Sequence, residues 1–535
     1  MRPPIGEAAF DEALALIDDS GVAAWLEEAV TATHRRPGRP REISVRALLV
    51  ALLCLALDDR ALHLSAATEV LFVRLSPTAR RTLALTSTVT NEASFTARYR
   101  QVRYLFHAVR AVLDPSGLAL NRRLSASELA EHSKQMSDEQ RDVALERLER
   151  FMGELLFASL PKRFNEELTA YGLDATPVPL FSRGPSARSG RCASDPDGGW
   201  YVREGDHRER EDHRGRNLAR VHWALEATVL TTASMTAGTV GSAPKLVVGL
   251  ALGRPGVDPA GTATRVLAGA VVRGAKAGPL GVDRAYSGAL ASGFHLPARA
   301  LGFSPVMDYR VDQLGRQANS HGAVMVEGSW YCPGLPEALV SATSDFRAQR
   351  IDEATYAARI LARADFALKR KSGPDPDGYE RFMCPALGEH PKVRCALRTS
   401  SLVHLGKRTV ATPPRESPTI CSQHSITIAP DVGGRFAQSP AFGTVEWARL
   451  YATLRNTIEG WNGFAKDTAH EALAQPARRR VRGIAAQGIL LTFLYVAANL
   501  RKIETFEAQV VHRETVEARK RARRRRVSLK DFQPS

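Results

Sequence analysis

The chain has 535 residues, long enough for two to four domains, and its hydrophobic content of 44% supports a large apolar core. Lys and Arg outnumber Asp and Glu by 73 to 57, which leaves a formal net charge of +16. This composition excludes collagen-like and mostly disordered classes, and the charge favours a polyanionic partner, because displacing counterions from phosphates drives binding.

Nucleic acid is therefore the expected partner, with an anionic membrane surface or plain solubility as alternatives. The N-terminus turns acidic too early for a signal peptide. Residues 483–500 carry no charge, but Gln487, Thr492 and Asn499 interrupt them, so we expect a buried core helix here and no membrane partner. The expected location is cytoplasmic and nucleoid-associated.

The first 160 residues are predicted to be helical. Apolar residues recur at helical spacing in five segments, which are 10–17, 22–30, 45–56, 62–73 and 138–160. A basic connector, RRPGRPRE at 35–42, separates the second segment from the third. Small helical domains with basic connectors are common DNA-binding units, so we expect residues 1–160 to bind DNA; a plain helical packing domain is the alternative.

Beyond residue 160 the pattern changes to short strands mixed with helices. A strand is predicted at 168–176, closed off by Pro177 and Pro179. The later elements are strands at 200–203, 222–230 and 245–252, a helix at 259–271, a strand at 280–283, a helix at 290–301 and a strand at 305–309. This order predicts a mixed α/β layout. His207 and His213 lie among alternating charges, which we interpret as an exposed loop and not a metal site.

The C-terminal quarter is predicted to hold two long helices. Thr444 is a plausible N-cap for a helix that runs to about Lys466, and a second helix covers about 477–506. A basic run follows at 519–526, interpreted as a DNA contact, with a solvated end as the alternative.

Three acids stand out by their context. Asp174 and Asp283 each end a predicted strand, where a sheet presents a carboxylate to a cleft without burying it, and Glu459 lies in mid-helix. Carboxylates are hard oxygen ligands for Mg²⁺ or Mn²⁺, and two such ions about 4 Å apart can clamp the attacking and leaving oxygens of phosphoryl transfer. A strand-end Asp that merely forms a turn is the alternative for either aspartate.

The helix around Glu459 places charge on one face. At about 100° per residue, Arg455, Glu459 and Lys466 fall within roughly 40° of one another. An apolar stripe lies beside them, formed by Leu454, Ile458, Trp461 and Ala465. A solvated Arg455–Glu459 pair, which would contribute only about 0.3–0.5 kcal/mol, is the alternative interpretation.

The spacing Arg455-x3-Glu459-x6-Lys466 resembles the signature around the last acid of bacterial insertion-sequence transposases of the DDE type. In that signature a Tyr precedes the Arg with two residues between; here position 452 is Ala and Tyr451 comes one residue early, so the tyrosine's role is not carried over. Other matching segments, from 37 to 503, are Gly38-Arg-Pro-Arg-Glu, Leu173-Asp174-Ala-Thr, Asp283-Arg-Ala-Tyr286, Arg480-Val-Arg482-Gly and Ala498-Asn499-Leu-Arg501.

The resemblance implies a ribonuclease H-like mixed sheet with flanking helices, in which Asp174, Asp283 and Glu459 bind two Mg²⁺ or Mn²⁺ ions. It implies that the metals activate water to nick the transposon end and that the freed 3′-hydroxyl attacks target DNA, with Arg455 and Lys466 holding phosphate. The implied partners are inverted-repeat ends, target DNA and further copies of the chain, as a homodimer or larger assembly on DNA.

The expected organisation has five parts: a helical DNA-binding region at 1–160, the first part of the catalytic core at 165–310, an insertion at 311–443 that is often β-rich in related transposases, the last catalytic helices at 444–510, and a basic tail at 511–535. Rival acids are Asp308 for the second position, Asp195 and Asp197 for the first, and Glu446 and Glu471 for the last. Rival functions are a nuclease on the same core that cleaves without joining and an inactive or domesticated DNA-binding relative.

Zinc is a second metal to consider. Cys384, Cys395, Cys421 and His424 are candidate ligands, with Cys332 or His390 as further ones, but only Cys421 and His424 have the close spacing usual in structural zinc sites. Free buried thiols are the favoured interpretation. Cys54 is expected in the core and Cys192 in a loop.

Overall fold

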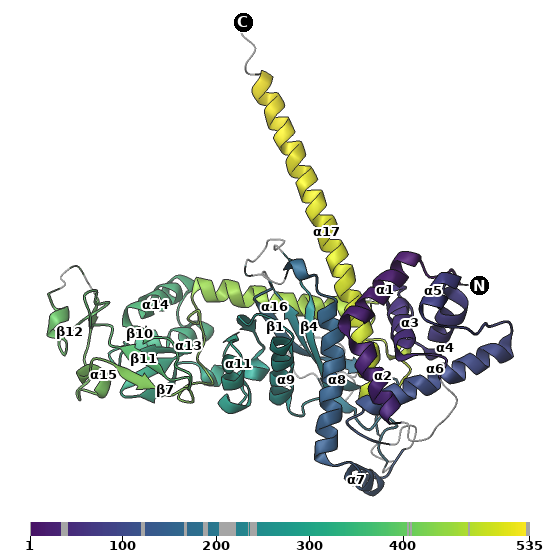
Figure 1. Cartoon of the computed structure of the whole chain (residues 1–535). Coiled ribbons are helices and arrows are strands. Elements are labelled where there is room, and N and C mark those ends of the chain that lie inside the picture. The colour runs from purple at the N-terminus through teal and green to yellow at the C-terminus, as the bar shows by residue number, and fades with distance from the viewer. Residues whose placement is uncertain are drawn as a thin grey trace, which may run out of the picture.

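The computed structural model describes residues 2–33, 41–118, 123–164, 168–185, 191–202, 221–233, 235, 243–403, 406, 409–468 and 471–530. A mixed α/β body occupies the centre of the molecule, with the N-terminal helices on one side and residues 311–443 on the other (Figure 1). The described residues exclude positions 35–40 of the basic connector, with Gly38 among them, and include only its last two positions, 41 and 42. They also exclude the loop that carries His207 and His213.

The central sheet has six strands: β1 (Tyr171–Pro179), β2 (Gly199–Val202), β3 (Val221–Thr232), β4 (Val247–Gly253), β5 (Pro279–Gly281) and β6 (Ser304–Val306). β3 lies antiparallel between β1 and β4, and β2 also pairs with β3. β5 runs parallel to β1 on its other side, and β6 parallel to β5. The mixed α/β layout predicted from the order of elements is therefore present.

β1 does not end at its prolines, which corrects the prediction of a strand closed by Pro177 and Pro179. Both lie inside β1, paired with Glu226 and Ala224. The N–H of Leu180 donates a hydrogen bond to β3. Since successive residues of a strand alternate in the direction of their backbone nitrogens, Pro177 and Pro179 direct theirs away from β3. β5 pairs with β1 only at Tyr171 and Gly172, so that edge is open and no hydrogen bond is lost.

Two sets of helices cover the two faces of the sheet. The side chains of Tyr171 and Leu173 pack with α9 (Pro259–Val272), α10 (Arg284–Ser287) and α11 (Leu296–Ala300). Gly172, on the opposite face of β1, lies against α16 (Val445–Lys466). The predicted N-cap is confirmed, because Thr444 Oγ1 accepts a hydrogen bond from the N–H of Trp447.

The N-terminal region is helical throughout its ordered elements: α1 (Glu7–Ser20), α2 (Val22–Ala32), α3 (Val45–Leu57), α4 (Leu64–Glu69), α5 (Pro77–Thr82), α6 (Glu92–Leu113), α7 (Ala126–Lys134) and α8 (Asp138–Ala158). Helix α6 was not predicted, because its buried residues begin only at Val102 while its first half is polar. Apart from α7, which has no buried residue, these helices share one apolar core with the sheet and with the last helix.

The last helix, α17 (Ile484–Lys530), is 47 residues long and leaves the body as a straight rod (Figure 1). It begins after the predicted start at 477, because residues 476–478 form a separate short turn of helix, and it continues past 506 through most of the predicted tail. By length and composition α17 is the one described helix apolar enough to cross a membrane, with 89% of that apolar window buried inside the protein. Core helices of soluble proteins pass the same test.

Residues 311–443 form a mixed unit, not a β-rich one. Eight short strands make three small sheets: β7 (Arg316–Ser320), β8 (Ala323–Val326) and β9 (Ser329–Tyr331); β10 (Lys369–Ser372), β11 (Glu380–Met383) and β14 (Ile426–Ile428); β12 (Arg394–Cys395) and β13 (Val410–Ala411). Four helices accompany them: α12 (Glu337–Val340), α13 (Ala342–Arg347), α14 (Glu353–Phe366) and α15 (Thr419–Ser422). They enclose a core of their own.

Candidate active site

Three elements direct an acid toward the same place. Asp174 lies two residues after Gly172 on β1 and therefore on the same face, toward α16. Asp283 follows β5 and caps α10, its carboxylate accepting a hydrogen bond of 2.5 Å from the N–H of Arg284. Glu459 lies on α16. The three acids predicted to share a site therefore come together.

A pair of glycines lets α16 approach the sheet closely. Gly172 and Gly281 are direct partners in the β1–β5 pairing. A Cβ added at Gly172 would lie 2.8 Å from the carbonyl oxygen of Leu454, and one at Gly281 would lie 2.4 Å from the Leu454 Cβ. Both distances are shorter than van der Waals contact, so only glycine permits this approach. The next turn of α16 after Leu454 carries Glu459 to the acids.

Arg455 stands between the three carboxylates. Its Nη2 atom lies 2.5 Å from Glu459 Oε1 and 3.9 Å from Asp283 Oδ2, and its Nη1 atom lies 4.0 Å from Asp174 Oδ1. Nη1 is buried without a hydrogen-bond partner. One guanidinium thus balances the negative charge of all three acids, and the Arg455–Glu459 contact is part of a network and not the isolated surface pair considered from the sequence.

The electrostatics of the site reflect a surplus of negative charge. Burial raises the pKa of Asp174 to about 6, with the neighbouring carboxylates of Asp283 and Glu459 adding to the effect and Arg455 opposing it. Burial lowers the pKa of Arg455, but the three acids outweigh that and raise it overall. Asp174 is the most enclosed of the acids, with 19% of its side chain exposed against 43% for Asp283 and 56% for Glu459.

Two residues that sequence reasoning did not assign also belong to the site. Asn462, two turns after Arg455 on α16, donates a hydrogen bond of 3.1 Å from its amide nitrogen to Asp174 Oδ2. Tyr451, one turn before Arg455, stacks on Trp447 and has a pKa raised by burial, then by Asp308 and Asp283 nearby. Asn462 follows Arg455 by seven residues, which places both on the same face of the helix. This spacing is the one feature of the sequence that could have indicated Asn462 as a site residue.

The rival acids have other partners. Asp308 accepts hydrogen bonds from Arg284 and, at 2.6 Å, from Arg347 of α13, so its carboxylate joins the body to residues 311–443. Asp195 and Asp197 accept hydrogen bonds of 2.9 Å from the N–H groups of Gly483 and Ile484, at the start of α17.

The rivals for the last position are also placed elsewhere. Glu471 is buried against Arg501. Glu446 lies in the first turn of α16 and is exposed.

The oxygen donors suit a hard divalent cation. Asp174, Asp283 and Glu459 supply carboxylate oxygens around Arg455, whose positive charge compensates theirs. In the described part of the chain no three acidic, His or Cys side chains come close enough to enclose a metal ion as they stand. Lys466 ends α16, two turns beyond Glu459.

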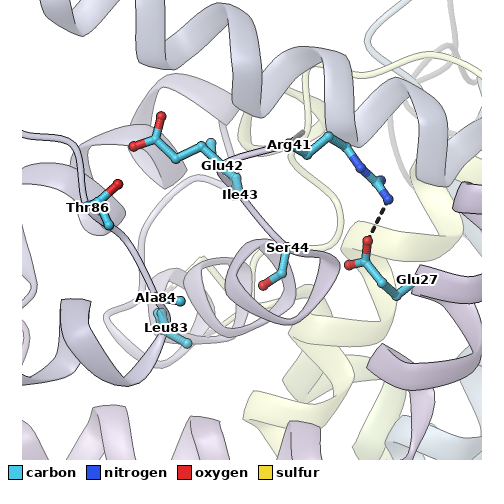
Figure 2. A pocket seen from close by; sticks show the side chains of 8 residues that line it. All are labelled: Glu27, Arg41, Glu42, Ile43, Ser44, Leu83, Ala84 and Thr86. Atoms are coloured by element: carbon cyan, nitrogen blue, oxygen red, sulfur yellow. Dashed lines mark hydrogen bonds and ion pairs between the residues drawn. The ribbon is translucent and has the colours of Figure 1, made fainter. Parts of the chain in front are cut away.

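A pocket in the N-terminal region offers a different location, and its charges are used internally. It lies between α2, the segment before α3 and residues 83–86 (Figure 2). Arg41 pairs with Glu27 at 2.6 Å across it, and Glu42 bonds to Arg98 and to the N–H of Ser87. Both acids that line the pocket are therefore engaged in contacts that hold the helices together.

The cysteines occupy three environments. Cys54 is buried in the N-terminal core as expected, and Cys192 is partly exposed in a loop. The other four, Cys332, Cys384, Cys395 and Cys421, are buried within residues 311–443. His390 and His424, the histidines considered as zinc ligands, are exposed.

Compared with models of known protein families, and with curated proteins, the sequence matches none of them.

Proposed function

We propose that this protein is a DNA transposase of the DDE type, cutting DNA at transposon ends and joining the freed end to target DNA. The observation that carries the proposal is the meeting of Asp174, Asp283 and Glu459 around one arginine, from two adjacent parallel strands and one helix. Convergence of three separated acids at a sheet edge is costly unless a cation joins them. A site that binds two metal ions would supply such cations.

The strand arrangement supports a ribonuclease H-like core. Without the short β2, the sheet runs β4-β3-β1-β5-β6, so Asp174 lies on the first strand and Asp283 follows the fourth. The third acid comes from α16, late in the chain. This is the distribution of acids that such a core would supply, and it accounts for the order of the matching motifs.

Mg²⁺ or Mn²⁺, bound as two ions, would supply Lewis-acid activation of water and of the scissile phosphate. The chain's own residues hold and orient those ions: Asp174 is fixed by Asn462, Asp283 by the start of α10, and Glu459 by the packing of α16 on Gly172 and Gly281. Arg455, released from the acids, carries its planar guanidinium to the phosphate, and Lys466 adds a point charge on the same helical face.

DNA is the proposed partner, as inverted-repeat ends and target, with the helical N-terminal region binding it and with a homodimer or larger assembly at paired ends. The net charge of +16 supports the choice of a polyanion. A nuclease on the same core would cleave without joining, and an inactive relative would bind DNA without cutting it. The first alternative shares every residue of the site, whereas the second leaves the three converging acids without a use.

The test is an assay with duplexes that carry the ends bordering the gene, in Mg²⁺ and in Mn²⁺, scored for nicking and for joined product. Asp174→Asn, Asp283→Asn and Glu459→Gln should each lower both by a factor on the order of a thousand or more. Glu446→Gln, on the exposed first turn of the same helix, should retain both activities. Strand transfer by Glu459→Gln at the normal rate would contradict the assignment. Nicking without joining would favour the nuclease.

A further inference from the structure

Four buried cysteines in residues 311–443 come from four separate segments. Cys332 follows β9, Cys384 follows β11, Cys395 ends β12 and Cys421 lies in α15. Each is at most 5% exposed, and none is in a disulfide. The chain from the first to the last spans about 90 residues of small sheets and helices, so only the fold of this unit can bring the four together.

Contacts around Arg398 bring three of the four together. The backbone of Arg398 pairs with Cys395, and its guanidinium donates to the carbonyl oxygens of Ile420 (3.2 Å) and Ser422 (3.4 Å), on either side of Cys421. The same guanidinium also lies against the thiol of Cys384, where it lowers the pKa that burial raises. The Nε atom of Arg398 is buried without a partner.

The fourth cysteine joins through the neighbouring strand. Gly334, two residues after Cys332, packs against Ala411 and Thr412, and Ala411 is the register partner of Cys395 in the β12–β13 pair. Burial raises the pKa of Cys332 to about 12, and Cys384, Cys421 and Cys395 each add to that rise. Through Gly334 and the β12–β13 pairing, the segment of Cys332 lies beside that of Cys395.

Two of the four lie in the same short motif. Cys332-Pro-Gly-Leu and Cys384-Pro-Ala-Leu repeat the pattern Cys-Pro-x-Leu after a strand. In each, the N–H two residues on points at the sulfur: Gly334 donates to Cys332 Sγ at 3.4 Å, and Ala386 does so to Cys384. A backbone donor aimed at a sulfur stabilises its thiolate form, which is the form that binds metal.

We propose that Cys332, Cys384, Cys395 and Cys421 bind one structural zinc ion that holds the four segments of residues 311–443 together. Four thiolates and no open position make a closed, tetrahedral site, and burial excludes water from it. As the chain stands the four sulfurs do not enclose an ion, so binding zinc would draw the thiols closer together. Zinc binding displaces the four thiol protons. The exposed His424 and His390 are not ligands in this arrangement.

The experiment measures zinc in the purified full-length chain, before and after incubation with zinc chloride and removal of excess. We expect one zinc ion per chain, with less than about half an equivalent overturning the proposal. Substitution of cobalt should give the intense near-ultraviolet absorption of thiolate-to-cobalt charge transfer. Absence of that band from a cobalt-loaded chain would also overturn a thiolate site.

Single variants identify the ligands. Cys332→Ser, Cys384→Ser, Cys395→Ser and Cys421→Ser should each lose the bound zinc, whereas Cys192→Ser, at a partly exposed loop position, should keep it. Zinc retained in full by all four variants would contradict the assignment. Where a variant fails to fold, a thiol reagent added to the native wild-type chain should release zinc in step with the modification of these thiols. Glu459→Gln should keep its zinc, so this test is independent of the proposed transposase activity.

Discussion

The side-chain amide of Asn462 donates a hydrogen bond of 3.1 Å to Oδ2 of Asp174, joining α16 to β1 across 288 positions of sequence. The bond orients the least exposed of the three acids, and it is shorter than the 4.0 Å separation between Asp174 and Arg455. Partners that orient a metal ligand contribute to affinity without touching the ion.

Asn462→Ala should therefore weaken Mn²⁺ binding and slow DNA cleavage by about 10- to 100-fold. The measurement is metal titration by calorimetry together with the cleavage rate at saturating Mn²⁺. Asn462→Asp adds a negative charge to three existing acids and should be worse than Ala for cleavage. Equal activity of the alanine variant and the wild type would show that Asp174 needs no support.

Gly281→Ala should push α16 away from the sheet, because the added Cβ would lie 2.4 Å from Leu454 Cβ. We expect a loss of about 1–3 kcal/mol in the free energy of unfolding and a larger loss of activity, since Glu459 moves with the helix. Gly460→Ala is the matched control: it adjoins Glu459, and its Cβ would meet nothing within 4 Å. Thermal denaturation and the cleavage assay separate the two variants, and equal behaviour would refute the close-approach explanation.

Asp308→Asn should loosen residues 311–443 from the body while leaving the metal site intact. It removes the carboxylate shared by Arg284 and Arg347, at a cost of about 1–3 kcal/mol in the free energy of unfolding. Limited proteolysis should cut the variant faster near residue 311, with Mn²⁺ affinity unchanged. Glu337→Gln, which breaks only the exposed pair with Arg316, should change stability by less than about 0.5 kcal/mol. A large drop in metal affinity on Asp308→Asn would instead make Asp308 a ligand.

Stability should fall as pH rises through neutrality because of Asp197. Burial, with the nearby Asp114, raises the pKa of this carboxyl to about 7 in the folded chain. Between about pH 4 and pH 7, Asp197 is therefore protonated in the folded chain and ionised in the unfolded chain. Unfolding releases this proton, so the free energy of unfolding falls as pH rises across that range. Asp197→Asn should raise the free energy of unfolding by up to about 4 kcal/mol at pH 8 and by little at pH 4, since the pKa rises by about three units at about 1.4 kcal/mol each.

Chemical denaturation at the two pH values measures that difference, and Asp258→Asn, an exposed N-cap, serves as the comparison. An Asn at 197 can still accept the hydrogen bond from the N–H of Ile484 through its amide oxygen. A gain that is equal at pH 4 and pH 8 would exclude titration of Asp197 as its cause.

Replacing Arg519, Lys520 and Arg521 by Gln should weaken binding to duplex DNA and lower its salt dependence. If all three contact phosphate, the slope of log K against log salt should decrease by up to about 3. Fluorescence anisotropy at several salt concentrations gives the slope.

The control for net charge removes three basic residues from the other end of the molecule, Arg370, Lys371 and Arg381. An unchanged slope for the helix variant would show that the end of α17 is a solvated extension and not a DNA contact.

Asp174 lies inside β1 and not at a strand end as predicted. The sequence nevertheless singled out the three acids, because the motif spacing, the chain order and one helical face can be read without the fold. It could not reveal Arg455 between them, nor the glycine pair that seats α16, because both depend on which residues face each other across the sheet. The prediction that Pro177 ends β1 was wrong for a related reason: a proline breaks a strand only where its nitrogen faces a partner, and here it faces an open edge.

For the helices too, features set by neighbouring residues could be predicted, and features set by contacts across the fold could not. Thr444 was identified from its side chain alone, whereas the first half of α6 has no apolar pattern and went unnoticed. The sequence suggested Cys384, Cys395, Cys421 and His424 as candidate zinc ligands, and the structure buries the three cysteines in one core while His424 is exposed.

A single unbroken helix connects the interior of the protein to its most basic segment. From Phe506, where α17 leaves the core, to its end at Lys530 the rod extends by about 36 Å, at about 1.5 Å per residue. That length equals about one turn of B-form DNA. If DNA is the partner, as proposed above, a duplex lying along this rod would meet the basic segment about one helical turn beyond the point where α17 leaves the core, and the length of α17 would set that spacing.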